Sequence, residues 1–107
     1  MADELAISDV KDESRYEATL DGVVAGVVEY QLDGDVIMFT HTGVPSEFEG
    51  RGIASQLARY VLDDARSRGL DVLPRCPYIA GWIARHLEYL DLVPPASRVR
   101  YKLPAEA

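Results

Sequence analysis

The amino-acid sequence predicts a single α+β domain, in which an antiparallel meander continues into a β-α-β unit and a second helix. Two observations carry this prediction. In the first part of the chain polar and apolar residues alternate, which is the period of half-buried strands. From residue 51 the apolar residues recur every three or four positions, which is the period of a helix. A chain of 107 residues has room for one domain that buries roughly 60–70% of its unfolded surface.

Strand segments fill the first half of the chain. Tyr16, Ala18 and Leu20 alternate with polar neighbours, and Asp-Gly pairs at 21–22 and 33–34 supply two hairpin turns. We expect three strands and a shorter one before them, at residues 15–20, 23–32, 35–42 and 7–11. These segments predict an antiparallel meander of three or four strands.

Helices and short strands follow each other in the second half. A wide apolar stripe predicts a helix over 51–68, and Gly69 is suited to end it. A short strand is expected at 70–74, and Pro77 suits the first position of a second helix. A β-α-β connection through the first helix would place residues 70–74 parallel to 35–42. Three more segments complete the prediction, namely a last strand at 97–103 and flexible ends at 1–6 and 104–107.

The composition favours a globular protein over a membrane, secreted or metal-binding one. Apolar residues make up 48% and charged residues 27% of the chain, as in ordinary globular proteins. No apolar run approaches the ~20 residues of a membrane span, and the first residues lack the pattern of a secretory signal. The single Cys76 can form neither an internal disulfide nor a thiolate metal site. We therefore expect a cytoplasmic protein without a metal and without a role at a membrane.

The charge is negative overall but unevenly distributed. A net charge of −7 argues against nonspecific nucleic-acid binding. Residues 1–50 hold 2 basic and 12 acidic side chains, whereas residues 51–107 hold 9 basic and 6 acidic ones. A polyanionic ligand would prefer the second half, and a cationic substrate would approach the first, unless the two halves are simply two solvated faces.

The stretch PSEFEGRGIAS, residues 45–55, places two glycines directly before the first helix. A plain turn, a dinucleotide fingerprint and a cradle for another phosphorylated ligand are the three interpretations. The fingerprint needs a third glycine where Ser55 stands, and the Gly-Lys-Ser/Thr of a nucleotide-triphosphate loop is missing. Gly50 and Gly52 let a ligand approach the backbone, next to the unpaired N–H groups of a helix N-terminus. These residues alone leave the turn and the anion cradle open.

Longer stretches around the loop carry a resemblance to a known family. The segment HTGVPSEFEGRGIASQLARYVLDDARSRGLDVLP resembles the acetyl-CoA-binding motif of the GNAT superfamily of N-acetyltransferases. In that family a Q/R-x-x-G-x-G/A loop joins a strand to a helix and cradles the CoA pyrophosphate. With CPYIAGWIARHLEYLDLV after it, the chain is similar to the small YjdJ-type subgroup of single-domain acetyltransferase-like proteins, from Arg15 to Lys102. The resemblance implies one minimal GNAT-like domain over residues 1–107.

Acetyl-CoA is the cosubstrate that the resemblance implies. Residues 49–54 take the place of the family's loop motif, and Glu49 stands where other members usually carry Gln or Arg. Glu49 would oppose a phosphate group, and Arg51 could compensate. The candidate cofactor contacts are Thr42, Gly43, Val44, Gly50, Arg51, Gly52, Ile53, Ala54, Ser55, Arg75 and Arg85.

In this family two parallel strands also separate and admit the pantetheine arm between them. Carried over, the separation falls at residues 41–44 on one side and 73–76 on the other. Gly43, Pro45 and Pro74 interrupt strand pairing there. A free backbone N–H at this opening could polarise the thioester carbonyl.

Three residues near the opening are candidates for catalysis. His41 suits a general base because imidazole side chains titrate near neutrality, with a structural histidine as the equal alternative. Cys76, before the second helix, could accept the acetyl group, line the pantetheine slot or be a small buried side chain. Tyr78 could donate a proton to the departing thiolate or simply pack. His86 is expected to cap the second helix or to meet a CoA phosphate.

The predicted function is transfer of an acetyl group from acetyl-CoA to an amine, by direct attack rather than through an acetylated Cys76. Residues 11–15 leave no room for the two helices that often cover the acceptor site in the family. An exposed amine on a protein or a polyamine is therefore the expected acceptor. The alternative is a CoA- or acyl-CoA-binding sensor or interaction module without efficient catalysis. A monomer or weak dimer is expected.

Overall fold

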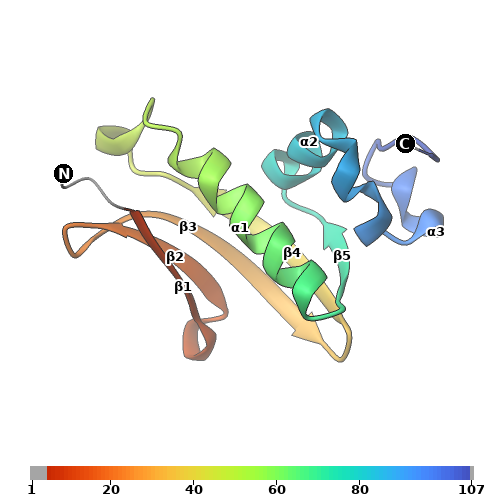
Figure 1. Ribbon diagram of the computed structural model, residues 1–107, viewed down its shortest axis with the longest axis horizontal. Coiled ribbons are helices and arrows are strands. Elements are labelled where there is room, and N and C mark those ends of the chain that lie inside the picture. Colours follow the sequence, from red (N-terminus) through yellow and green to blue (C-terminus); the bar gives the residue numbers. More distant parts are fainter. Residues whose placement is uncertain (1–4, 107) are drawn as a thin grey trace.

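The computed structural model describes residues 5–106 and contains one five-stranded sheet in the order β1-β2-β3-β4-β5 (Figure 1). The strands are β1 (Leu5–Val10), β2 (Arg15–Leu20), β3 (Val23–Asp33), β4 (Val36–Gly43) and β5 (Asp71–Pro74). The α-helices are α1 (Ile53–Ser67), α2 (Pro77–Arg85) and α3 (Pro95–Arg98), and the 3-10 segments are η1 (Lys11–Glu13), η2 (Ser46–Phe48) and η3 (Leu87–Leu92). The α+β prediction is confirmed.

Strand pairing follows the predicted topology. Strands β1 to β4 form an antiparallel meander, and β5 pairs with β4 in parallel after the chain has passed through α1. The parallel ladder is short, from Val36 opposite Asp71 to Phe39 opposite Pro74. Because β4 continues to Gly43, its last residues extend beyond the end of β5.

Both long helices pack on one face of the sheet (Figure 1). Glycine at position 26 of β3 lets α1 approach, because a Cβ there would lie 2.9 Å from Leu57 Cδ1 and 3.0 Å from Ile53 Cγ2. Val28 and Tyr30, which alternate with Gly26, are buried on this face. Glu29, between them, is exposed on the opposite face. The core therefore lies between the sheet and the two helices.

The two ends of the described chain differ from the prediction. Leu5 and Ala6 belong to β1 rather than to a flexible end, and residues 1–4 and 107 lie outside the described residues. The strand expected at 97–103 is wrong. Pro95 starts α3 instead, and the Arg98 carbonyl accepts hydrogen bonds from the Tyr101 and Leu103 amides in the turns that follow.

The alternating pattern of 97–103 suggested a strand, but the segment has neither a core to bury Val99 nor a long strand to pair with. Val99 is 83% exposed, so the apolar position that a strand would bury lies in solvent. The neighbouring edge, β5, offers only four residues for pairing. In the part of the chain that the structure describes, no helix combines the length and the apolar character that a membrane crossing demands.

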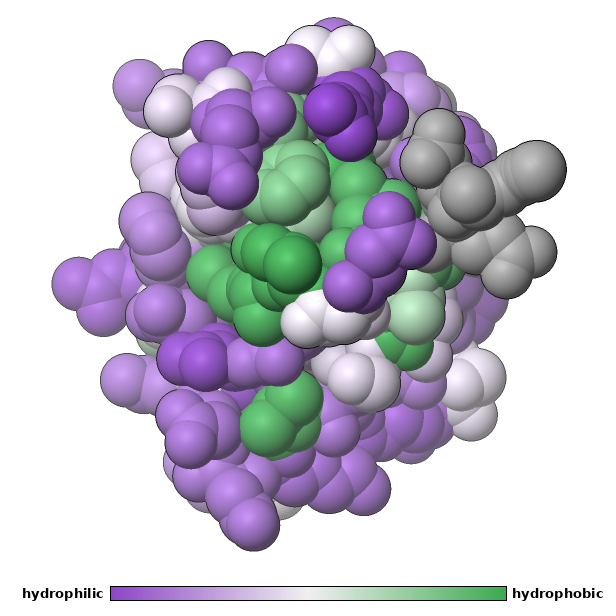
Figure 2. All heavy atoms as spheres, turned by 90° about the vertical axis from the view of Figure 1, so that its left-hand side faces the viewer, coloured by the Kyte–Doolittle hydropathy of each residue, from purple (hydrophilic) through white to green (hydrophobic). Residues whose placement is uncertain are grey.

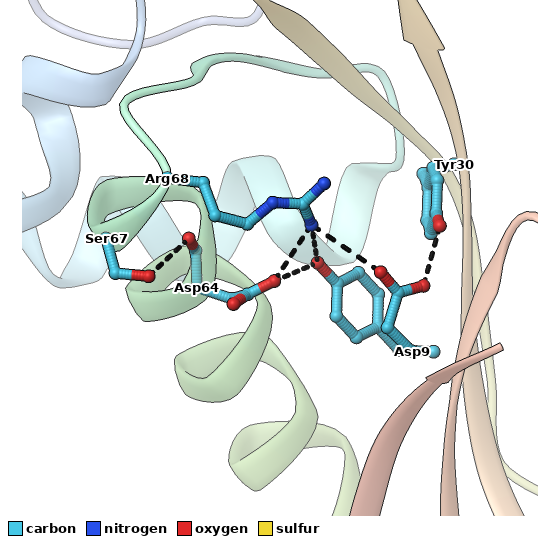
Figure 3. Close-up of polar contacts among 6 residues, drawn as sticks. Asp9, Tyr30, Asp64, Ser67 and Arg68 are labelled. Carbon is cyan, nitrogen blue, oxygen red and sulfur yellow. Dashed lines mark hydrogen bonds and ion pairs between the residues drawn. The ribbon is translucent and has the colours of Figure 1, made fainter. Parts of the chain in front are cut away.

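A polar cluster joins the C-terminal end of α1 to the first three strands (Figure 3). The Tyr16 hydroxyl donates to Asp64 at 2.6 Å, and the Tyr30 hydroxyl donates to Asp9 at 2.6 Å. Arg68 lies between the two carboxylates, with Nη1 at 3.1 Å from Asp64 and 3.5 Å from Asp9. Both tyrosine rings are buried, so each hydroxyl needs the partner it has found.

The opposite end of the molecule, near the start of α1, is more apolar. Figure 2 views this end and shows apolar surface at its centre within a polar surround. At the β2–β3 turn Val23 and Val24 are 51% and 39% exposed. Leu5, Leu20 and Ile53 line a shallow pocket of about 510 Å³.

Candidate functional site

The loop between β4 and α1 holds the two glycines singled out from the sequence. Their φ angles are +84° at Gly50 and +74° at Gly52, in the left-handed region that favours glycine. A Cβ placed on either glycine would meet no atom within 4 Å. The side of the loop where a side chain would stand is therefore open, and a ligand can reach the backbone there.

Six consecutive backbone amides around this loop find no acceptor within residues 5–106. Among the described residues, no hydrogen bond starts from an N–H of residues 50–55. The first helical bond runs from the Gln56 amide to the Gly52 carbonyl, and Gly52 has no side chain with which to cap the helix. The helix dipole adds partial positive charge at the same place.

These amides border a hollow of about 140 Å³. Its lining residues are Val44, Phe48, Glu49, Gly50, Gly52, Ile53, Ala54 and Ser55. The guanidinium carbon of Arg51 lies 5.6 Å from the centre of the Phe48 ring, which holds the cation beside the loop. Within residues 5–106, neither Arg51 nor Glu49 takes part in an ion pair. The hollow can therefore hold an anion, with an exposed carboxylate at its rim.

The strands β4 and β5 separate next to this loop. Phe39 opposite Pro74 is the last pair of the ladder, and beyond it the Cys76 amide donates to the Phe39 carbonyl at 2.8 Å. Residues 41–43 of β4 pair only with β3. The opening thus begins later than predicted on the β5 side, because Pro74 still occupies a ladder position at the edge strand, where a missing N–H is tolerated.

Thr42 and Cys76 face each other across the opening. The Thr42 Oγ1 lies 3.1 Å from the Cys76 Sγ, and the thiol is 3% exposed at the N-cap of α2. Thr42 points to the helix side of the sheet because its cross-strand partner is the buried Val28. The sequence marked Thr42 and Cys76 separately, and no local signal joins two residues that lie 34 positions apart.

Tyr78 links the first turns of the two helices. Its hydroxyl lies 3.3 Å from the Ser55 Oγ, so the half-buried side chain reaches from α2 to the first turn of α1. Further along α2, Trp82 and His86 stack with their rings 3.9 Å apart, and His86 Nδ1 lies 2.9 Å from the Trp82 carbonyl. His86 therefore ends α2, which was one of its two predicted roles.

His41 lies on the other face of the sheet. It pairs with Glu29 across the strands, and both side chains are exposed. The neighbouring Gly43 shares this face, because a Cβ there would lie 3.1 Å from His41 Nε2. The structure therefore brings Thr42, Cys76, Ser55 and Tyr78 to one side of the opening and leaves His41 on the other.

Two predicted phosphate ligands stand apart from the loop. Arg75 follows β5 and Arg85 ends α2, and both are exposed. Arg85 Nη1 would lie 3.4 Å from a Cβ at Gly81, on the outward side of α2. Neither arginine lines the hollow at the glycine loop.

Comparison with known proteins agrees with this fold. The solution structure of a GCN5-like protein from Staphylococcus aureus matches with a TM-score of 0.64 at 21% identity, over 87% of this chain and 89% of that one. The ribosomal-protein-S18-alanine N-acetyltransferase of Escherichia coli matches with a TM-score of 0.52 at 19% identity. That match covers 54% of this chain, which spans only 38% of the enzyme's length.

The family of the chain follows from a match to a family model, since these distant structures show the fold alone. The model described as GCN5-related N-acetyl-transferase matches residues 15–92, from the start of β2 to the end of η3. The matched range includes the glycine loop, the opening between β4 and β5, and α2. The chain belongs to the GCN5-related N-acetyltransferase family.

Proposed function

We propose that the protein binds acetyl-CoA and transfers its acetyl group to an amine. The observation that carries this proposal is the run of six unpaired amides at residues 50–55, over which the backbone is open. A pyrophosphate offers the acceptor oxygens and negative charge that such a helix N-terminus stabilises. The open space above Gly50 and Gly52 fits this group, because a side chain at either position would occupy it.

The opening beside Thr42 is the proposed place of the chemistry. Acetyl-CoA supplies a thioester there, whose carbonyl carbon can be attacked by an amine and whose sulfur can leave as a thiolate. In direct transfer the C–N bond forms, the C–S bond breaks, and the amine loses a proton. Tyr78 holds a proton at its hydroxyl that can go to the leaving thiolate, and His41 is our candidate acceptor of the amine's proton.

The acceptor is proposed to be an exposed amine of a protein or polyamine. Only the three residues of η1 and Ser14 stand between β1 and β2, so no helical cover lies over this part of the described chain. On the exposed face the Glu29 carboxylate lies opposite His41 and offers a negative charge to an approaching ammonium group. We further propose the YjdJ-type subgroup and, from the single cysteine, a cytoplasmic location.

A second candidate is a CoA- or acyl-CoA-binding module without efficient turnover. Two observations favour it, namely the Glu49 carboxylate at the rim of the hollow and the separation of His41 from Tyr78 and Cys76 by the sheet. The position of His41 on the other face weakens catalysis, and Glu49 lowers affinity without abolishing it, because the backbone amides do not depend on side chains.

Calorimetric titration with CoA and acetyl-CoA, followed by thiol release over a panel of amines, tests both candidates. Binding with acetyl-CoA-dependent thiol release is the result expected for the transferase. Binding without release supports the module, and no binding of either ligand overturns both. Mass spectrometry after incubation with acetyl-CoA then looks for an acetyl group on Cys76. Such an adduct, with loss of turnover in Cys76→Ala, would replace direct attack by an acetyl-enzyme.

A further inference from the structure

A groove on the outward side of α2 is a feature that the proposed acetyl transfer does not use. It has a volume of about 440 Å³ and lies between α2, the end of β5 and the turns after α3. Its lining residues are Pro74, Arg75, Pro77, Ala80, Gly81, Ala84, Arg100, Tyr101 and Lys102. A volume of this size is ordinary for small-molecule sites.

The charged residues of this groove are all cations. Arg75, Arg100 and Lys102 line it, and no Asp or Glu does. Within residues 5–106, none of the three side chains makes an ion pair or a hydrogen bond. By contrast, Arg15, Arg66 and Arg68 each meet a carboxylate. In a chain with a net charge of −7, the groove therefore gathers three cations and no carboxylate in one place.

Small residues line the α2 side of the groove. On α2 the groove is lined by the half-buried Ala80 and Gly81 and the exposed Ala84, and the half-buried Tyr101 also lines it. The turn keeps Lys102 at φ +62°, a left-handed conformation that residues other than glycine rarely adopt. The groove thus combines an apolar body with a cationic rim.

The groove is separate from the glycine loop. The residues of α2 that face α1 are Tyr78 and Trp82, which contact Ser55 and Arg59. The groove lies on the other flank of α2, and it shares no lining residue with the hollow at the unpaired amides. An anion bound here would therefore not be the pyrophosphate that the proposed function places at α1.

We propose that this groove binds a small organic anion, in which a carboxylate or phosphate group is carried on an apolar or aromatic body. The charged group meets Arg75, Arg100 and Lys102, and the body lies on the small residues of α2 and against Tyr101. Guanidinium groups bind carboxylates and phosphates through paired N–H donors, which gives two of the three cations a preference for such anions.

Residue-resolved NMR titration of the whole chain with benzoate and with phenyl phosphate tests the proposal. The expected result is a saturable shift of the amides of Gly81, Ala84 and Lys102 with both anions and none with benzylamine. Arg100→Gln should weaken the binding about tenfold or more, the cost of one charge-assisted contact. Lys11→Gln, which removes an exposed cation at η1, is the matched control and should leave it unchanged.

Three further results would overturn the proposal. The first is an absence of saturable shifts in the groove with either anion, and the second is equal binding by Arg100→Gln. The third is displacement of the anion from the groove when CoA is added, which would assign the cations to the cofactor. Shifts confined to residues 50–55 would report the glycine loop instead. Failure of CoA to bind, with benzoate still in the groove, would contradict the acetyl transfer alone.

Discussion

The two ends of α1 differ in whether the backbone groups of their terminal turns find hydrogen-bond partners. At the C-terminal end the Asp64 carbonyl accepts from the Arg68 amide and the Ser67 hydroxyl, and the Ala65 carbonyl accepts from the Leu70 amide. Asp64 and Arg68 are tied into the sheet through Tyr16 (Figure 3). At the N-terminal end the amides of residues 50–55 meet nothing among the described residues.

This difference separates stability from binding within one helix. Groups satisfied inside the chain contribute to folding, whereas groups left unpaired but exposed can be satisfied by a ligand at little cost to the free protein. Changes at the C-terminal end of α1 should therefore alter the free energy of unfolding. Changes at the N-terminal end should alter affinity for the ligand. Four predictions test this division.

The largest expected effect is at the loop. Gly52→Val puts a branched side chain into the open space above the amides, and we expect CoA affinity to fall by about a hundredfold or more, as two charge-assisted contacts are lost. Calorimetric titration measures it. Gly34→Val is the matched control, because Gly34 also has a left-handed φ, of +60°, with nothing within 4 Å. If both variants bind CoA equally, the cradle is not at Gly52.

Next in size is the loss of the polar cluster. Asp64→Ala removes the acceptor of the Tyr16 hydroxyl and a partner of Arg68, and should lower the free energy of unfolding by about 2–3 kcal/mol. Urea denaturation measures this change. Tyr16→Phe should cost about 1 kcal/mol, because Arg68 still pairs with Asp64. CoA affinity should stay the same in both variants, and a parallel loss would show that the two ends are coupled.

Alkaline pH should weaken the same end of the helix. Burial, and then the hydrogen bond to Asp9, raises the pKa of Tyr30 to about 12, and burial with the Asp64 hydrogen bond raises the pKa of Tyr16 further. In the unfolded chain tyrosine loses its proton near pH 10. The folded state therefore binds more protons between about pH 10 and 12, and stability should fall as pH rises through that range. Urea unfolding at several pH values measures the slope, which Tyr30→Phe should reduce.

The smallest expected effect is a change in CoA affinity when the charge of Glu49, beside the glycine loop, is removed. Glu49→Gln removes a negative charge beside the unpaired amides and should raise CoA affinity about two- to fivefold, the size of one charge at a helix terminus. Salt should shrink the difference between the two proteins. An affinity that falls instead would show that Glu49 helps to hold the ligand or the loop.

Local chemistry made most of the fold predictable. The alternation of Tyr16, Ala18 and Leu20 and the Asp-Gly turns gave β2 its bounds, and the apolar stripe gave α1 to within two residues. Gly50 and Gly52, singled out by the sequence, take positive φ angles in the turn from η2 into α1. The strand expected at 97–103 failed because strand pairing needs a neighbour that the sequence pattern does not reveal.

The face on which His41 lies depends on a single residue. Tyr30 pairs with Phe39 but Glu29 pairs with His41, so Thr40 is an extra residue in β4. Simple alternation from Phe39 would have put His41 on the helix side, and the bulge moves Thr42 there instead. The polar cluster was equally hidden, since Tyr16 and Asp64 are 48 positions apart.

Strand β5 has a consequence beyond the opening that it leaves beside β4. It is an outer strand of the sheet, with four residues that end in a proline. A strand of a neighbouring molecule could form only a few hydrogen bonds with the backbone of β5, and Pro74 has no N–H to donate to it. The shortness of β5, which leaves the end of β4 unpaired on that side, therefore also discourages self-association of the chain into fibrils.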